Sequence, residues 1–298
     1  MSPAPDGTVT WRELLAEAVG LLSAAPALRA TAEVDARWMV ADCMGVAAAE
    51  LSSALGASAT ERGVARFDEM VRRRCQGEPL QYVLGSWGFR TLDLMVDERV
   101  LIPRPETEAV VEVALGELDR LDIRDRAPTV IDLGTGSGAI ALSIAVERVR
   151  VEVWATDVSR DALAVARANT AGIGRPGARV RLAEGEWFAA LPSKLAGSVD
   201  MIVSNPPYVA SSATLPSEVE NWEPGPALWS GPDGTDDLRS IIAGAAAWLR
   251  DQGVLVCELS PEQAEPMRQL ALEHFTEASV RSDLTGRPRA LVARLPQR

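Results

Sequence analysis

The fold is decided by Val130-Ile-Asp-Leu-Gly134-Thr-Gly136-Ser-Gly138-Ala139, near the middle of a chain of 298 residues. The pattern predicts a buried strand that runs into a glycine loop, which in turn opens a helix. Glycines let the backbone turn tightly and approach a ligand, and the first turn of a helix offers free N–H groups. The spacing also fits the dinucleotide pattern GxGxxA, and a tight strand-to-helix turn is the simpler alternative. By itself the loop indicates a nucleotide-like ligand without identifying it.

Strands and helices alternate from Glu106 to the end of the chain. We expect strands near 129–133, 152–156, 180–182, 201–203, 254–258 and 290–294, and helices near 106–121, 139–146, 160–169, 238–249 and 262–274. Such alternation is typical of α/β proteins with a doubly wound, mostly parallel sheet that helices cover on both faces.

The part of the chain before Glu106 has a different pattern. Residues 10–77 carry apolar residues at helical spacing and predict a small helical bundle. Tyr82–Leu84, followed by an alternation of apolar and polar residues over 92–96, predicts a β-hairpin. We therefore expect a helical bundle over 1–77 (a candidate surface for docking a substrate), a hairpin linker over 78–104 and a catalytic domain over 105–298. The run Arg72-Arg73-Arg74 is interpreted as a solvated face.

A carboxylate follows the second predicted strand of the α/β part. Asp157 lies 23 residues after Gly134, where it can accept hydrogen bonds from both hydroxyls of a ribose. The alternative is that Asp157 caps the next helix, although Ser159 is the better candidate for that cap. At this point both NAD and S-adenosylmethionine (SAM) remain possible ligands.

Asn205-Pro206-Pro207-Tyr208 follows the strand at 201–203, at the carboxyl end where doubly wound sheets bind ligands. A planar amide or aromatic amine is a poor nucleophile, and its NH₂ group donates two hydrogen bonds. The side-chain oxygen of Asn205 and the backbone carbonyl of Pro206 can accept them, the two prolines stiffen the loop, and Tyr208 can lie against the flat group. This arrangement favours in-line transfer of a methyl group to nitrogen, a reaction that needs no histidine.

The glycine loop at 132–138 together with Asn-Pro-Pro-Tyr at 205–208 resembles the SAM-dependent amino-methyltransferases. Three further stretches are similar to the HemK/PrmC family, the N5-glutamine methyltransferases of class I peptide chain release factors. They are Gly77-Glu-Pro-Leu-Gln-Tyr82 with Gly85, Leu101-Ile-Pro-Arg-Pro-Glu-Thr-Glu108, and Glu223-Pro224 with Ala227-Leu228 and Asp233-Gly234.

The resemblance implies a Rossmann-like methyltransferase domain with an N-terminal helical bundle, SAM as cofactor and a release factor as protein partner. It also implies a site whose cofactor-binding residues are Gly134, Thr135, Gly136, Ser137, Gly138, Asp157, Glu186, Trp187 and Asn205. Asn205, Pro206, Pro207 and Tyr208 would hold the substrate glutamine, and Asn205, Pro206 and Tyr208 would be catalytic. The sequence departs from the family at Glu186 (expected Asp, beside the adenine), Ser260 (expected Gly) and Thr235 (expected Leu). Arg104, Glu106 and Glu108 either border the cofactor or cap the helix that follows them.

The amino-acid composition counts against several other classes of protein. The net charge of −12 disfavours a sequence-independent nucleic-acid binder, which needs a basic face. His274 is the only histidine and the three cysteines form no CxxC pair, so we expect no metal site. No secretory signal is visible in Met1–Thr10 and no apolar stretch is long enough to span a bilayer, so we expect a cytoplasmic protein with no membrane or direct nucleic-acid partner.

Three alternatives remain at this stage. A ribosomal-protein glutamine methyltransferase shares the chemistry. A DNA adenine-N6 methyltransferase can use the same tetrapeptide on a flipped base, although the acidic charge and the lack of a basic recognition domain count against it. The non-enzyme alternative is a protein that binds SAM without catalysis.

Overall fold

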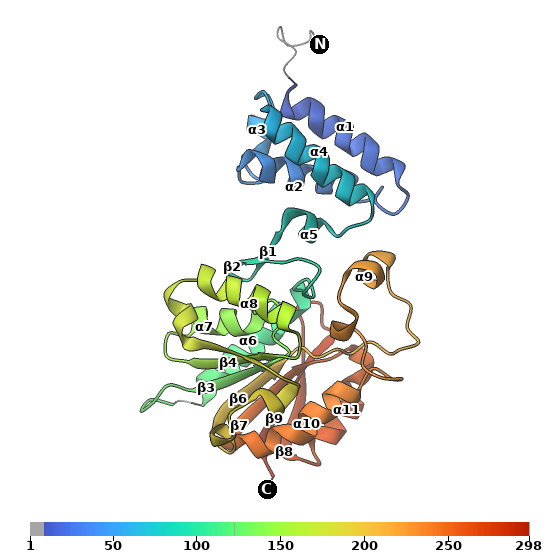
Figure 1. Cartoon of the computed structure of the whole chain (residues 1–298). Helices are drawn as coiled ribbons and strands as arrows, with labels where there is room; N and C mark the ends of the chain where they lie inside the picture. Colours follow the sequence, from blue (N-terminus) through green and yellow to red (C-terminus); the bar gives the residue numbers. More distant parts are fainter. Residues whose placement is uncertain (1–8, 122, 298) are drawn as a thin grey trace. The chain divides into compact units, whose positions relative to one another are not determined.

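The computed structural model describes residues 9–121 and 123–297, which form two compact units (Figure 1). One unit comprises the described chain up to Gly85 together with Pro216–Trp222, and the other comprises the rest of the described chain. The first eight residues of the segment Met1–Thr10, from which no secretory signal was expected, lie outside the described residues. The ranges 1–77, 78–104 and 105–298 stay a prediction about separate domains.

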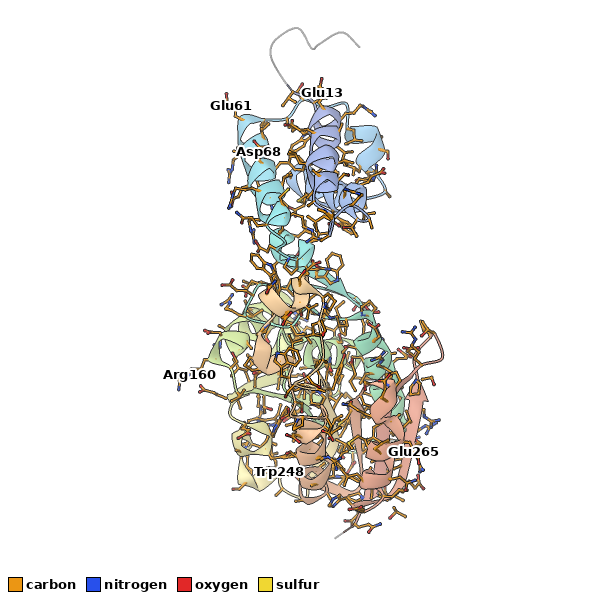
Figure 2. All side chains as sticks on the ribbon, turned by 90° about the vertical axis from the view of Figure 1, so that its right-hand side faces the viewer. Glu13, Glu61, Asp68, Arg160, Trp248 and Glu265 are labelled. Atoms are coloured by element: carbon orange, nitrogen blue, oxygen red, sulfur yellow. The ribbon has the colours of Figure 1, made fainter. Side chains whose placement is uncertain are left out.

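The helical unit is built from six helices of the described chain, which are α1 (Trp11–Ala24), α2 (Ala32–Met44), α3 (Leu51–Ala54), α4 (Glu61–Cys75), α5 (Leu80–Leu84) and α9 (Ser217–Trp222). At the start of α1, Thr10 and Glu13 form a capping box in which each side chain bonds the other's backbone N–H (Glu13 is labelled in Figure 2). The edge of the Trp11 ring meets Phe67 of α4 at 6.0 Å between ring centres. Apolar faces of α1, α2 and α4 thus supply the core of this unit.

One part of the predicted hairpin is helical instead. Tyr82–Leu84 was expected to be a strand, but it forms the end of α5, so this prediction is wrong. Pro79 precedes the helix and its carbonyl accepts the N–H of Tyr82 at 3.0 Å, while Gly85 ends it in the left-handed conformation. The proline and the glycine enclose a single helical turn, and these two residues override the strand preference of Tyr82 and Val83.

The arginine run is also not a uniform solvated face. The side chain of Arg74 is only 5% exposed, and its Nε donates to Asp35 of α2 at 2.8 Å. Its Nη1 donates to the carbonyl oxygen of Glu78 at 2.9 Å and to Glu218 of α9 at 3.2 Å. Arg72, in contrast, is exposed and pairs with Glu69, one turn earlier. Arg74 is therefore a structural charge whose buried partner, Asp35, could not be read from the run itself.

The second unit contains two sheets. A hairpin pairs β1 (Ser86–Phe89) with β2 (Leu92–Met95) in antiparallel register. The large sheet has the strand order β5-β4-β3-β6-β7-β9-β8. Its strands are β3 (Thr129–Leu133), β4 (Glu152–Asp157), β5 (Val180–Glu184), β6 (Val199–Ser204), β7 (Leu249–Glu258), β8 (Phe275–Ser282) and β9 (Pro288–Pro296). The five strands from β3 to β7 run parallel, and β9 is antiparallel to both of its neighbours.

Helices cover both faces of this sheet (Figure 1). They are α6 (Pro105–Arg120), α7 (Ala139–Glu147), α8 (Arg160–Gly172), α10 (Asp236–Trp248) and α11 (Ala264–Ala271), and short 3₁₀ turns occupy Arg175–Arg179, Trp187–Ala190, Ser193–Leu195, Gly225–Ala227 and Pro261–Gln263. Successive strand residues point to opposite faces. Val130 accordingly packs with α6 and α7, whereas Ile131 packs with α10 and α11, and both are fully buried. The predicted α/β doubly wound fold is confirmed.

The structure adds one strand that the sequence pattern did not predict. β8 begins at Phe275 and forms the edge of the large sheet, pairing only with β9 among the described strands. Its side chains are mostly polar and exposed beyond Phe275, so it lacks the apolar run of the central strands. Within the described residues, every helix is too short or too polar to cross a membrane.

Candidate active site

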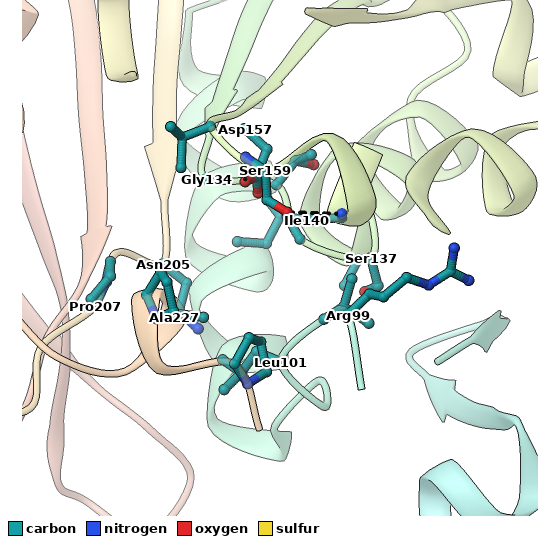
Figure 3. Close-up of a pocket in the computed structure, with 18 of the residues that line it drawn as sticks. Arg99, Leu101, Gly134, Ser137, Ile140, Asp157, Ser159, Asn205, Pro207 and Ala227 are labelled. Carbon is teal, nitrogen blue, oxygen red and sulfur yellow. Dashed lines mark hydrogen bonds between the residues drawn. The ribbon is translucent and has the colours of Figure 1, made fainter. Parts of the chain in front are cut away.

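A pocket opens at the carboxyl ends of the parallel strands, where the order of the sheet reverses between β3 and its two neighbours β4 and β6. It has about 1250 Å³ of empty space, including its open mouth. Loops after β3, β4, β5 and β6 contribute to its lining, with Asp157 and Ser159 in one part and Asn205 and Pro207 in another (Figure 3). Doubly wound sheets bind their ligands at this switch point.

The glycine loop forms the floor of the pocket. Gly134, Gly136 and Gly138 all have positive φ, which only glycine adopts at low cost. At Gly134 (φ +72°) a Cβ would also come within 3.3 Å of the Trp187 ring. Gly138 is the N-cap residue of α7, and its N–H closes the turn on the carbonyl oxygen of Thr135 at 2.8 Å. Gly134 and Gly136, which line the pocket, thus leave the backbone uncovered at their two positions.

A buried carboxylate supports this loop from below. Oδ2 of Asp132 accepts the hydroxyl of Thr135 at 2.7 Å and the N–H of Ala141 at 3.1 Å. Burial raises the pKa of Asp132 to about 7, against the lowering effect of those two hydrogen bonds. Asp132 therefore fixes the loop to the first turn of α7.

Asp157 ends β4 and lines the pocket. Its Oδ2 accepts the N–H of Gly136 at 2.9 Å, and its Oδ1 accepts the N–H of Ser159 at 2.9 Å. Each carboxylate oxygen has a second lone pair that remains for a ligand. Burial raises the pKa of Asp157, while the backbone hydrogen bonds lower it. Ser159 caps α8 by accepting the N–H of Ala162 at 3.1 Å, so Asp157 is not the helix cap.

Glu186 and Trp187 follow β5 and line the opposite wall. Trp187 has φ +42°, an unusual value for a large side chain. Its ring lies against Gly134, and Glu186 is exposed beside it. A flat ring and a carboxylate in adjacent positions are suited to a purine base and its exocyclic amine, and these two roles stay predictions.

Asn205 stands at the end of β6 and lines the same pocket. Its Nδ2 donates to the hydroxyl of Thr107 in α6 at 3.1 Å, and that hydroxyl donates to Oε2 of Glu258 at the end of β7 at 2.7 Å. Oδ1 of Asn205 is buried and has no hydrogen-bond partner among the described residues. Burial raises the pKa of Glu258 to about 7. Oδ1 of Asn205 can therefore accept a hydrogen bond from a ligand at the pocket wall.

The tetrapeptide is held from behind by backbone contacts. Nε2 of Gln263 donates to the carbonyl oxygens of Tyr208, at 3.1 Å, and Gly234, at 2.8 Å. Gly234 has φ +75° and packs directly on the Tyr208 backbone. Burial raises the pKa of Tyr208 to about 12, and the negative charge of Glu258 adds to the shift. The path of the loop is fixed on two sides, in addition to the stiffness that Pro206 and Pro207 provide.

The wall on the side of α6 depends on an ion pair. Arg104 pairs with Glu223, whose side chain is 1% exposed and also accepts the N–H of Ile102 at 3.2 Å. This pair ties the segment of Leu101 and Pro103 to that of Pro224, and all three line the pocket. Arg104 therefore shapes the pocket from outside its lining.

Glu108 lies one helical turn beyond Arg104, near the start of α6. Its Oε1 accepts the backbone N–H of Arg90 at 2.9 Å, so its side chain contacts the β1–β2 turn. Neither Glu106 nor Glu108 is among the residues that line the pocket.

The structure brings together most of the site residues expected from the sequence. Those that line the pocket are Gly134, Thr135, Gly136, Ser137, Asp157, Glu186, Trp187, Asn205 and Pro207. Gly138, Pro206 and Tyr208 do not line it. Sequence reasoning missed Thr107, Glu223 and Gln263, which hold the lining in place.

All three of these residues could have been noticed. Thr107 lies inside the quoted stretch 101–108, and Glu223 lies in the quoted pair Glu223-Pro224. Ser260 and Gln263 have the spacing of a capping box, and the structure forms that box. Ser260 in place of glycine thus has a local role. Thr235 in place of leucine likewise bonds Asp233 through its hydroxyl at 2.6 Å before α10.

Two family models match the sequence. The PrmC N-terminal domain matches residues 13–85, and the methyltransferase small domain matches residues 117–221. Similar solved structures include a T. thermophilus 16S rRNA N2 G1207 methyltransferase (TM-score 0.50, 19% identity, 70% of this chain and 49% of that one) and the hMettl16 catalytic domain (TM-score 0.51, 16% identity, 80% of this chain and 85% of that one). At these identities the likeness concerns the fold alone.

The family model over the sheet and the pocket at its carboxyl edge therefore define a methyltransferase. Relatives that match most of this chain identify the family of methyltransferases. A release factor glutamine methyltransferase from Xylella fastidiosa is 44% identical over 244 residues, covering 81% of this chain and 84% of the relative. Another from Moorella thermoacetica is 39% identical over 291 residues, covering 96% and 98%. The chain belongs to the family of release factor glutamine methyltransferases.

Proposed function

We propose that this enzyme transfers a methyl group from SAM to the side-chain amide nitrogen (N5) of the glutamine in the Gly-Gly-Gln motif of class I peptide chain release factors. The substrate in this proposal comes from the names of the relatives and from the chemistry of Asn205. We further propose that it acts in the cytoplasm, the compartment of translation termination.

Three lining residues support SAM as the cofactor. We infer that Asp157 would accept two ribose hydroxyls with its free lone pairs, and that Glu186 and Trp187 would contact the purine. Three carboxylates line the pocket, those of Asp157, Glu186 and Asp237, against one cation, Arg99, which pairs with Asp97 at 2.5 Å. This excess of negative charge favours a ligand with a positively charged sulfonium. When bound, SAM supplies an electrophilic methyl group.

The observation that carries the proposal is the buried Oδ1 of Asn205, which has no hydrogen-bond partner among the described residues and belongs to the pocket that the glycine loop and Asp157 also line. A buried acceptor without a partner costs about 1–3 kcal/mol, and an incoming amide N–H removes that cost. We infer that Asn205 Oδ1 and the Pro206 carbonyl accept the two N–H groups of the substrate amide. These hydrogen bonds orient the nitrogen lone pair toward the methyl carbon.

The remaining residues position groups and exclude water. Tyr208 is held by Gln263 and Gly234 and would lie against the planar amide. With a pKa of about 12, Tyr208 keeps its proton at neutral pH and is not a base. The surplus proton of the methylated nitrogen passes to water. Most of the acceleration then comes from orientation and preorganised hydrogen bonding.

A parallel labelling assay tests the proposed substrate. The enzyme is incubated with radiolabelled SAM and, in separate reactions, a purified class I release factor, total ribosomal proteins and duplex DNA. Label on the release factor, lost when its Gly-Gly-Gln glutamine is replaced by alanine, is the expected result. Label on ribosomal proteins alone or on DNA alone would overturn the proposal.

A further inference from the structure

A chain of two hydrogen bonds ends on the Asn205 amide and begins at a buried carboxylate. Glu258 is fully buried at the end of β7, and Thr107 of α6 is 3% exposed. The Thr107 hydroxyl is 2.7 Å from Oε2 of Glu258 and 3.1 Å from Nδ2 of Asn205. Thr107 itself lines the pocket, while Glu258 lies behind it.

The number of protons on these three side chains determines which group donates and which accepts in each of the two hydrogen bonds. A threonine hydroxyl has one proton, and an ionised carboxylate only accepts. With Glu258 ionised, the Thr107 proton points to Oε2, so Thr107 can only accept from Asn205. The Asn205 side chain must then turn its NH₂ group toward Thr107 and its Oδ1 away from it.

We propose that Thr107 and Glu258 are positioning residues that fix the Asn205 amide so that its oxygen, and not its nitrogen, is presented to the substrate amide. This inference rests on the function proposed above. A substrate NH₂ group needs acceptors, and an Asn205 turned by 180° would face it with a second NH₂ group. The two hydrogen bonds that link Glu258, Thr107 and Asn205 are called the relay below. The relay decides whether Asn205 attracts or repels the NH₂ group of the substrate amide.

Protonation of Glu258 reverses the relay. A neutral carboxyl group can donate to Thr107, whose proton is then directed at Asn205 and attracts Oδ1. Burial raises the pKa of Glu258 to about 7. Glu106 raises it further, whereas the hydrogen bond from Thr107, the charge of Arg289 on β9 and the hydroxyl of Tyr208 lower it. Because the productive form is the ionised one, substrate use falls as the pH falls through about 7.

A purely structural role predicts something different. If the three side chains only satisfy one another inside the protein, breaking the chain reduces stability and affects both ligands alike. The relay acts on the protein substrate alone, because its last member, Asn205, presents an oxygen to that substrate. Comparison of the two ligands separates these cases.

The experiment compares Thr107→Val, which keeps the shape and removes the hydroxyl, with Thr107→Ser, which keeps the hydroxyl. Thr170→Val is the matched control, because the Thr170 hydroxyl donates only within α8, to the carbonyl oxygen of Ala166 at 2.7 Å. Each is assayed for kcat/KM with a Gly-Gly-Gln peptide and for the Kd of SAM by calorimetry. Thr107→Val should lose about 10- to 100-fold in kcat/KM with an unchanged Kd for SAM. Thr107→Ser and Thr170→Val should stay within about threefold of the wild type on both measures.

The pH profile gives a test that does not depend on a threonine variant. Wild-type kcat/KM for the peptide should fall on the acid side with an apparent pKa near 7, and Glu258→Gln should remove this limb because its side chain does not ionise. A limb that persists in Glu258→Gln would overturn the relay and point to another buried group such as Asp132, whose pKa is also about 7.

The outcomes separate this inference from the proposed function. A wild type that binds SAM and methylates no glutamine substrate overturns both. A wild type that methylates the peptide, with a Thr107→Val variant of equal kcat/KM, overturns the relay alone. Equal losses of SAM affinity and of peptide turnover in Thr107→Val also overturn it, since they indicate a structural role.

Discussion

A Cβ placed on Gly234 would stand 2.4 Å from the backbone carbonyl oxygen of Tyr208. The same oxygen accepts a hydrogen bond from Gln263 at 3.1 Å. The loop of the tetrapeptide is thus packed against a backbone that lies more than 25 residues later in the chain. This contact explains why a glycine stands at 234, where φ is +75° as well.

Gly234→Ala should therefore displace Tyr208 and with it the substrate side of the pocket. We expect kcat/KM for a Gly-Gly-Gln peptide to fall by at least about tenfold, with the Kd of SAM within about twofold of the wild type. Gly116→Ala on α6 is the control, since its Cβ meets nothing within 4 Å and alanine is the better helix former. A Gly234→Ala enzyme with normal peptide turnover would show that the loop tolerates the shift.

Asp157→Ala should weaken SAM binding. Two ribose hydroxyls bonded to one carboxylate contribute about 1.5–3 kcal/mol each, so the Kd should rise by at least about tenfold. Calorimetry measures it directly, with Asp161→Ala as a control of equal charge on the exposed face of α8. Unchanged affinity in Asp157→Ala would remove the assignment of this carboxylate to the ribose.

Asn205→Ala should abolish methyl transfer and leave the Kd of SAM nearly unchanged. The substitution removes the acceptor Oδ1, and its Nδ2 contacts only Thr107 among the hydrogen bonds of the described chain. Single-turnover assays with saturating SAM measure the loss. Substantial methylation by the variant would exclude Asn205 as the group that orients the nucleophile.

Asp35→Ala should destabilise the helical unit strongly. It leaves the guanidinium of Arg74, which is 5% exposed, without its buried partner. Breaking a buried ion pair from one side costs about 3–5 kcal/mol. Urea unfolding followed by far-UV circular dichroism, which reports the loss of helix, measures the change. Arg72→Ala, an exposed pair on the same helix, should change stability by less than about 0.5 kcal/mol, and an equal effect of the two would contradict a buried role.

Local patterns predicted the α/β fold because the central strands are apolar runs and because the glycine loop directly follows one of them. Val130–Leu133 is apolar on both faces, apart from Asp132, which supports the loop. Asp157 and Asn205 could be placed at one edge since parallel strands end on the same side of a sheet. The sequence did not show which partner faces Arg74, because Asp35 lies 39 residues away on another helix.

The elements that were missed depend on residues outside their own stretch. Tyr82–Leu84 has the composition of a strand, and the flanking Pro79 and Gly85 make it a helical turn. β8 is an edge strand with a polar face, stabilised by its ladder with β9. Thr107 lies in a stretch that resembles the family, but the sequence does not show its partners, Asn205 and Glu258, which reach it from the ends of β6 and β7.

If the pocket presents acceptors to a glutamine amide, the enzyme should methylate the nitrogen of that amide. Tandem mass spectrometry of a class I release factor, after incubation with the enzyme and SAM, locates the methyl group. We expect one added methyl group on the side-chain nitrogen of the Gly-Gly-Gln glutamine, absent with Asn205→Ala. A methyl group on another residue, or an unmodified release factor beside methylated ribosomal protein or DNA, would contradict it.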